Sequence, residues 1–197
     1  MKKNQKNNFI VSGMSKSVNA KAPARAEGDY YATDPVAIDC LLSEVTLSSK
    51  VWECACGEGH LSERLKDFGY DVYSTDITDR NYGDAFFDFL ACSTVFDGDI
   101  VTNPPFKCFE AFMRKGLECI SDGHKLVLLG KIQILEGQKR GRFFRDYPPR
   151  YVLVFSKRLR CAINGDFENF SDGMQAYAWY VFEKGYQGDT TLKWVNL

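Results

Sequence analysis

Residues 50–59 read KVWECACGEG, and this stretch decides the fold. Its apolar first part, residues 50–55, is typical of a short buried strand, and Gly57 and Gly59 then predict a tight turn into a helix. Glycines let a ligand approach the backbone closely, and the start of a helix carries partial positive charge. Glu53 lies near the end of the strand. Alone, such a turn is more often structural, so the prediction of a ligand-binding site here depends on the motifs that follow the turn.

Apolar strands and helical patterns alternate along the rest of the chain. Further strands are expected at residues 71–75, 97–102, 125–129, 151–155 and 176–183, and helices after Pro35, after Gly59, at 109–120 and at 134–147. Short connections between them predict right-handed crossovers. We therefore expect a doubly wound α/β fold, with a mostly parallel seven-stranded sheet, helices on both faces and an antiparallel last strand. In such a sheet, ligands bind beyond the carboxyl ends of the strands.

Composition indicates one domain, expected at residues 29–197, because 197 residues with 45% hydrophobic side chains supply one sizeable core. Residues 1–28 are polar and basic, which predicts a flexible basic N-terminal arm. The sequence contains neither a secretory signal nor an apolar run long enough to cross a membrane, so a cytoplasmic protein is expected. Seven cysteines without paired spacing, and two histidines, give no expectation of a structural metal. The oligomeric state is not indicated.

An acid also follows the second strand. Asp76 stands where the two hydroxyls of a cofactor ribose are gripped in doubly wound folds, although a helix cap or solvated turn is the alternative. Asp84 or Asp88, with Phe89, fits the edge and face of an adenine ring, while the phenyl group fits a core position equally well. Together with the glycine turn, these acids favour a nucleoside-containing cofactor.

The third strand end carries the most specific motif, Asn103-Pro104-Pro105-Phe106. Two prolines hold the chain extended and leave their carbonyls free to accept hydrogen bonds. An aromatic amine such as N6 of adenine is a poor nucleophile, because its lone pair is delocalised into the ring. If the side-chain oxygen of Asn103 and the carbonyl of Pro104 each accept one of its N–H bonds, the nitrogen is oriented and its developing positive charge is stabilised. Phe106 then stacks on the base, as aromatics do on unstacked bases.

Charge is distributed unevenly along the chain. Residues 53–100 hold eleven acids against three bases, whereas residues 131–160 hold nine bases against two acids. Such polarity favours a basic face for a polyanion, with a solvated helix as the alternative. The candidate nucleic-acid-binding residues are Lys131, Lys139, Arg140, Arg142, Lys157, Arg158 and Arg160.

These motifs, in this order, resemble those of class I S-adenosylmethionine-dependent methyltransferases, in the branch that methylates amines with an (Asp/Asn/Ser)-Pro-Pro-(Tyr/Phe) tetrapeptide. Residues 30–35 likewise resemble the segment before the first helix of adenine-specific DNA methyltransferases, and the likeness is greatest to small phage- or prophage-type enzymes. The resemblance implies S-adenosyl-L-methionine as cofactor, S-adenosyl-L-homocysteine as product, and DNA as substrate. The implied cofactor contacts are Tyr31, Thr33, Glu53, Cys54, Ala55, Gly57, Asp76, Ile77, Asp88, Phe89 and Asn103, and the implied catalytic residues are Asn103, Pro104, Pro105 and Phe106.

Two departures and several alternatives remain. Cys54 stands where the family commonly has proline, and only about ninety residues follow the tetrapeptide, which leaves no room for a large target-recognition domain. Sequence specificity is then expected from residues 157–173, from the basic helix at 138–145, or from a partner. Adenine N6 of DNA is the first expectation; cytosine N4, an RNA base and a protein glutamine amide are alternatives. A nicotinamide oxidoreductase or a non-catalytic nucleotide-binding module fits poorly, because the glycine turn lacks the Gly-x-Gly-x-x-Gly spacing.

Overall fold

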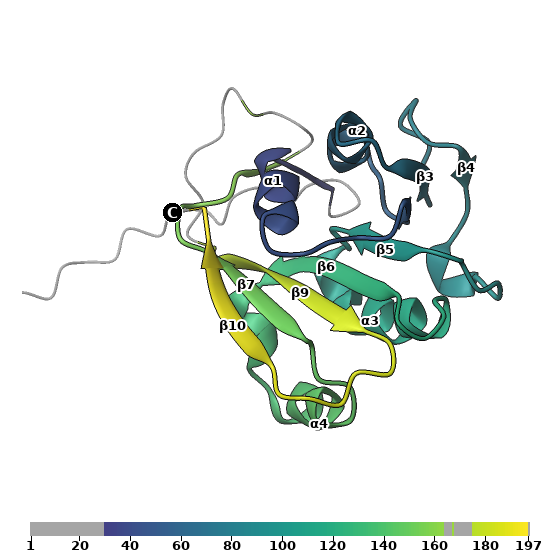
Figure 1. Cartoon of the computed structure of the whole chain (residues 1–197). Coiled ribbons are helices and arrows are strands. Elements are labelled where there is room, and N and C mark those ends of the chain that lie inside the picture. Colours follow the sequence, from purple (N-terminus) through teal and green to yellow (C-terminus); the bar gives the residue numbers. More distant parts are fainter. Residues whose placement is uncertain (1–29, 164–166, 168–174, 197) are drawn as a thin grey trace, which may run out of the picture.

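A computed structural model describes residues 30–163, 167 and 175–196 of the chain. The expected basic arm at 1–28 lies outside these residues. The polar segment 156–173, which the sequence predicts as a loop, is described only at residues 156–163 and 167. The remainder forms layers of helices on a central sheet (Figure 1).

The central sheet has eight strands, in the order β10-β7-β9-β6-β5-β2-β3-β4. Their bounds are β2 Lys50–Glu53, β3 Asp71–Asp76, β4 Ala85–Phe86, β5 Asp99–Thr102, β6 Lys125–Lys131, β7 Tyr151–Phe155, β9 Tyr177–Glu183 and β10 Thr191–Val195. Neighbouring strands are parallel except at β9, which runs antiparallel to both β6 and β7. The doubly wound, mostly parallel sheet is confirmed.

Two details of the expected sheet were wrong. The sheet has eight strands instead of seven, and the short β4 and the edge strand β10 are the two without a counterpart among the six ranges predicted as strands. The strand at 177–183 is antiparallel, but it is not the last: β10 follows and pairs in parallel with β7. β10 (TLKWV) is mostly exposed and only Val195 is buried. Its five residues give a weak strand signal because the run is short.

Helices cover both faces of the sheet. On one face α1 (Val36–Leu42) and α2 (His60–Asp67) pack on strand residues such as Val51 and Val101, in one core cluster. On the other, α3 (Phe109–Glu118) and α4 (Gln138–Asp146) pack on alternate residues of the same strands, such as Trp52 and Ile100. Successive strand residues point to opposite faces, so the apolar runs of the sequence fill two cores at once.

The helix expected at 134–147 is divided. A 3₁₀ turn, η4 (Ile132–Leu135), precedes α4, and Gly137 between them has a φ of 113°. Such a left-handed backbone interrupts a helix, and glycine adopts it without strain. Two shorter 3₁₀ turns, η2 (Phe89–Ala91) and η3 (Phe106–Cys108), lie after β4 and β5.

A second, two-stranded sheet was not expected. β1 (Tyr31–Thr33) pairs antiparallel with β8 (Cys161–Ile163), within a segment that the sequence predicts as loop. The amide of Asp34 donates to the carbonyl of Arg160 at 3.0 Å and continues the pair. This small sheet brings the start of the described chain against the segment that follows β7, beside the carboxyl ends of the main strands.

Candidate active site

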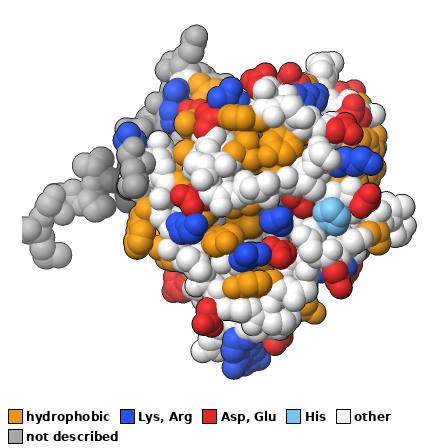
Figure 2. Space-filling view, in the orientation of Figure 1, with side chains coloured by type: hydrophobic (Ala, Val, Ile, Leu, Met, Phe, Trp, Pro, Cys, Tyr) orange, Lys and Arg blue, Asp and Glu red, His pale blue; other side chains and the backbone are white. Residues whose placement is uncertain are grey.

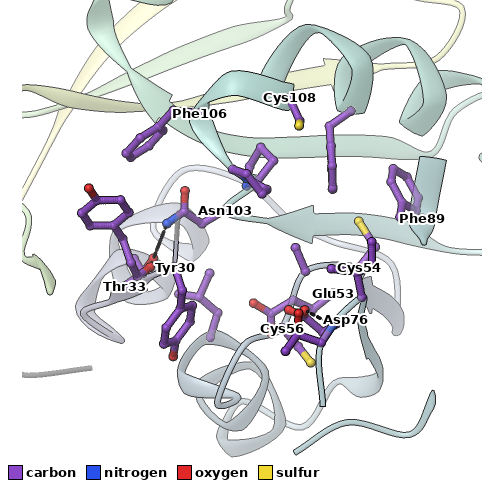
Figure 3. A pocket seen from close by; sticks show the side chains of 18 of the residues that line it. Tyr30, Thr33, Glu53, Cys54, Cys56, Asp76, Phe89, Asn103, Phe106 and Cys108 are labelled. Carbon is purple, nitrogen blue, oxygen red and sulfur yellow. Dashed lines mark hydrogen bonds between the residues drawn. The ribbon is translucent and has the colours of Figure 1, made fainter. Parts of the chain in front are cut away.

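A cavity of about 560 Å³ opens at the carboxyl ends of β2, β3 and β5. Its walls hold nearly all the residues expected to bind a cofactor or act in catalysis: Tyr31, Thr33, Glu53, Cys54, Ala55, Asp76, Ile77, Asp88, Phe89, Asn103, Pro104, Pro105 and Phe106. Figure 3 shows Asn103 and Phe106 on one side and Glu53 and Asp76 on the other. Strand ends that are far apart in the sequence thus converge on one space of a size usual for small-ligand sites.

Gly57 does not itself line the cavity, but it shapes the floor. Its amide donates to Oδ2 of Asp76 at 2.8 Å, and its φ is 57°. A Cβ atom at this position would lie 2.3 Å from the ring of Tyr30, so only glycine fits. Asp76 is 9% exposed and its Oδ1 accepts from the amide of Thr78 at 2.9 Å. Each carboxylate oxygen retains a lone pair for a further donor at the cavity.

Glu53 is buried at the end of β2, where it accepts a hydrogen bond from the hydroxyl of Ser62. Burial raises the pKa of this carboxyl from 4.5 to about 8; the hydrogen bond from Ser62 opposes the shift and the charge of Asp76 adds to it. Glu53 is therefore protonated, and neutral, at pH 7.

This buried carboxyl makes stability depend on pH. In the unfolded chain Glu53 loses its proton near pH 4.5, but in the folded protein only near pH 8. Between these values the folded state binds more protons, so the free energy of unfolding falls as pH rises. We expect Glu53→Gln to reduce this fall by about 3 kcal/mol between pH 5 and 8, since one pH unit corresponds to about 1.4 kcal/mol. Urea denaturation at pH 5 and at pH 8 measures the free energy of unfolding of each protein. Glu58→Gln, an exposed change in the same turn, is the control; equal slopes for all three proteins would contradict a protonated Glu53.

The two residues expected around an adenine ring lie at η2. Oδ1 of Asp88 accepts from the amide of Leu90 at 2.9 Å, so this carboxylate caps the turn at the cavity wall. Phe89 belongs to the hydrophobic core and also lines the cavity. Its ring packs edge-on against that of Trp52, with centroids 5.2 Å apart, and tilted against that of Phe112 at 5.0 Å. Asp84, the other candidate, accepts from the amide of Ser74 and does not line the cavity.

Asn103 is the most informative side chain of the site. Its Nδ2 donates to Oγ1 of Thr33 at 2.8 Å and to the carbonyl of Tyr31 at 3.4 Å. Its Oδ1 is buried and has no hydrogen-bond partner among the described residues. A buried acceptor without a partner is uncommon and costly in a folded protein, which points to a missing donor.

The rest of the tetrapeptide lines the same cavity. The carbonyl of Pro105 accepts from the amide of Cys108 at 2.8 Å, so it belongs to η3; within the described part of the chain the carbonyl of Pro104 has no such donor. The ring of Phe106 lies 5.5 Å from that of Tyr31 and 6.0 Å from that of Tyr177, and Nζ of Lys131 lies 4.3 Å from its centroid. Two acceptors and an aromatic ring therefore share one side of the cavity.

Several cavity residues escaped the sequence analysis. Tyr30 covers the glycine turn and accepts from the amide of Glu58 at 3.2 Å, and the guanidinium of Arg80 lies 4.4 Å from its ring. His60, Lys107 and Cys108 also line the cavity. Arg80 lies in an irregular segment and Lys107 in the three-residue turn η3, and neither is long enough to give a periodic signal. Only their charge beside the motifs distinguishes them.

Burial disfavours the thiolate form of Cys54 and Cys56, two of the thiols at the cavity. Burial, followed by the charges of Glu53 and Asp76, raises the pKa of Cys56 to about 12, and burial raises that of Cys54 as well. Over residues 30–163, 167 and 175–196, no group of three or more His, Cys, Asp or Glu side chains is placed to hold a metal ion. None of the helices in that part of the chain is long and apolar enough to cross a membrane.

The expected basic residues fall into two groups. Lys131 ends β6 beside the cavity, and Lys157, Arg158 and Arg160 follow β7 at the same edge of the sheet. Lys139, Arg140 and Arg142 lie on α4, which packs through Phe143 on Phe182, near the opposite edge. Arg140 is turned back and donates to the carbonyls of Ile134 and Glu136. On the face shown in Figure 2, basic and acidic side chains are interspersed.

Comparison with known proteins supports the fold. No family model and no curated protein matches the chain. Among solved structures, a type I restriction-modification methyltransferase subunit from Streptococcus thermophilus matches with a TM-score of 0.59 at 13% identity, over 81% of this chain and 46% of its own. A Listeria monocytogenes protein assigned to class I S-adenosylmethionine-dependent methyltransferases matches with 0.56 at 13%, over 81% and 62%. TrmN from Thermus thermophilus matches with 0.53 at 17%, over 76% and 48%.

The chain therefore shares its fold with these three solved structures, two of which are described as methyltransferases. The chain spans between 46% and 62% of the length of these three solved chains. The matches cover between 76% and 81% of this chain.

Proposed function

We propose that the protein transfers a methyl group from S-adenosyl-L-methionine to an exocyclic amine of a nucleic-acid base, and that the amine is N6 of adenine in DNA. The observation that carries this proposal is the unpartnered Oδ1 of Asn103, buried at a cavity whose opposite side holds Asp76. The products are the methylated base and S-adenosyl-L-homocysteine.

The cavity fits this cofactor by the chemistry of its donors and acceptors. Asp76 would accept hydrogen bonds from the ribose hydroxyls, and the glycine turn at Gly57 would lie against the cofactor at the start of α2. Asp88 and Phe89 would lie beside the adenine moiety. When bound, the cofactor supplies an electrophilic methyl group on a sulfonium.

The tetrapeptide would prepare the substrate amine. Oδ1 of Asn103 and the carbonyl of Pro104 each accept one N–H bond, which orients the nitrogen lone pair toward the cofactor side of the cavity. The same two oxygens stabilise the positive charge that grows on the nitrogen during transfer. An amide is not a base, so the proton leaves to water after transfer. Phe106 offers its ring to the face of the base.

Three observations favour a nucleic acid as the substrate. An aromatic ring beside the acceptor oxygens suits a planar base. Lysine and arginine residues cluster after β6 and β7, at the edge of the sheet where the cavity opens. Among the fold neighbours, one is a methyltransferase subunit of a type I restriction-modification system.

Lys131 allows a direct test of the nucleic-acid contact. We expect Lys131→Ala to weaken DNA binding and to lower the slope of log affinity against log salt by about 1, because one phosphate contact is lost. Lys139→Ala on α4 is the matched comparison, since this lysine is 82% exposed in its side chain and pairs with Glu110 at 3.2 Å. Fluorescence anisotropy over a salt series measures both. If Lys139→Ala has the larger effect, DNA lies on the α4 side instead.

The reaction is tested with S-adenosyl-L-methionine that carries a labelled methyl group. The protein is incubated with duplex DNA, single-stranded DNA, RNA and a glutamine-containing protein mixture, and the products are digested and separated. Label in N6-methyladenine from DNA is expected. Label in N4-methylcytosine, in an RNA nucleoside or in glutamine would redirect the substrate assignment, and no label in any of them, with no cofactor binding, would overturn the proposal.

A further inference from the structure

The orientation of the Asn103 amide is set by another part of the chain. Asn103 follows β5, yet its Nδ2 donates to two acceptors on β1, the hydroxyl of Thr33 and the carbonyl of Tyr31. A carbonyl can only accept, so the nitrogen must face β1 and Oδ1 must face away from it. Figure 3 shows the bond between Asn103 and Thr33 at the cavity wall.

We propose that Thr33 is a positioning residue for methyl transfer: its hydroxyl holds the Asn103 amide so that Oδ1 stays turned to the substrate amine. This inference rests on the proposed function and departs from the sequence expectation, in which Thr33 contacts the cofactor. The bond to Thr33 is shorter than that to Tyr31, 2.8 against 3.4 Å, so the hydroxyl is the stronger partner.

The surroundings of Thr33 keep its hydroxyl in place. The side chain is 3% exposed, and Thr33 pairs directly with Cys161 across the β1–β8 sheet. Burial raises the pKa of the Cys161 thiol to about 12, while hydrogen bonds from Tyr177 and Thr33 oppose the shift. The Thr33 hydroxyl, held beside Cys161 by this strand pairing, accepts the hydrogen bond from Nδ2 of Asn103. The small sheet between β1 and β8 thus completes the site.

Two substitutions separate positioning from cofactor binding. Thr33→Val keeps the shape of the side chain and removes the hydroxyl, whereas Thr33→Ser keeps the hydroxyl. We expect Thr33→Val to lower kcat about 10-fold, because a neutral hydrogen bond of this kind is worth about that factor. KM for the cofactor and the affinity for S-adenosyl-L-homocysteine should stay within about twofold, and Thr33→Ser should restore most of kcat. Thermal unfolding shows that the variants are folded.

A second readout does not need activity. The side-chain amide protons of Asn103 are assigned by NMR from the signals that Asn103→Ala removes. In the wild type and in Thr33→Ser they should exchange slowly with solvent, and in Thr33→Val exchange should be about tenfold faster. If the wild type transfers no methyl group, the proposed function fails, and the exchange rates still decide whether Thr33 holds the amide.

Three results would overturn the inference. The first is unchanged amide exchange in Thr33→Val. The second is a loss of S-adenosyl-L-homocysteine affinity with unchanged kcat, which would make Thr33 a cofactor contact. The third is an active wild type whose kcat is the same in Thr33→Val.

Discussion

Replacing Asn103 with alanine is expected to lower the rate of methyl transfer by about 100- to 1,000-fold, which is the usual effect of removing one oriented group that stabilises charge in a transition state. The physical reason is the buried, unpartnered Oδ1, which is placed to accept from the substrate amine. Affinity for S-adenosyl-L-homocysteine should change little, because Asp76 and the glycine turn remain. Single-turnover transfer of a labelled methyl group gives the rate, and calorimetry gives the affinity.

Asn103→Asp is the matched control for this experiment. It keeps an oxygen acceptor in the same place but loses the Nδ2 donor that bonds to Thr33 and Tyr31. Its rate should fall between those of wild type and Asn103→Ala. A rate for Asn103→Ala above about a tenth of wild type would contradict the oriented-amine mechanism, because positioning groups of this kind contribute several kcal/mol.

The second large effect is expected at Asp76. Asp76→Ala should weaken binding of S-adenosyl-L-homocysteine by at least about 100-fold, since the proposed contact with the ribose would lose two hydrogen bonds to a charged group, each worth about 1.5–3 kcal/mol. The change also leaves the amide of Gly57 without its acceptor, which loosens the turn at the cavity floor. Calorimetric titration measures the affinity.

Asp79→Ala is the control for Asp76, because it removes an acid from the same loop without touching the cavity. Asp79 is exposed and accepts from the amide of Asn81 at 2.8 Å. The affinity of Asp79→Ala for S-adenosyl-L-homocysteine should match that of the wild type. Comparable losses in both variants would mean that the net charge of the loop, and not a specific contact of Asp76, favours the cofactor.

The sequence predicts those parts of the site that lie in regular structure. β2, β3 and β5 are short apolar runs, so their ends are located to within two residues, and the residues after them converge because parallel strands share one edge. Glu53, Asp76 and Asn103 were therefore correctly brought to one cavity.

The parts that escaped prediction depend on contacts between distant segments. β1 and β8 have three residues each and pair across 130 positions, so neither has a detectable period of its own. The bond between Asn103 and Thr33 follows from that pairing and has no local signal. Likewise, in the sequence Arg140 looks like a free surface charge. In the structure its side chain donates to the carbonyls of Ile134 and Glu136, and this arrangement depends on the turn at Gly137.

A crystal structure with S-adenosyl-L-homocysteine bound is the most direct measurement of the central claim. We expect the ribose hydroxyls on the carboxylate of Asp76, the sulfur facing the tetrapeptide, and the buried Oδ1 of Asn103 on the side of the cavity that also holds Phe106. A ligand bound elsewhere, or one whose sulfur is separated from Asn103 by the wall of the cavity, would contradict it.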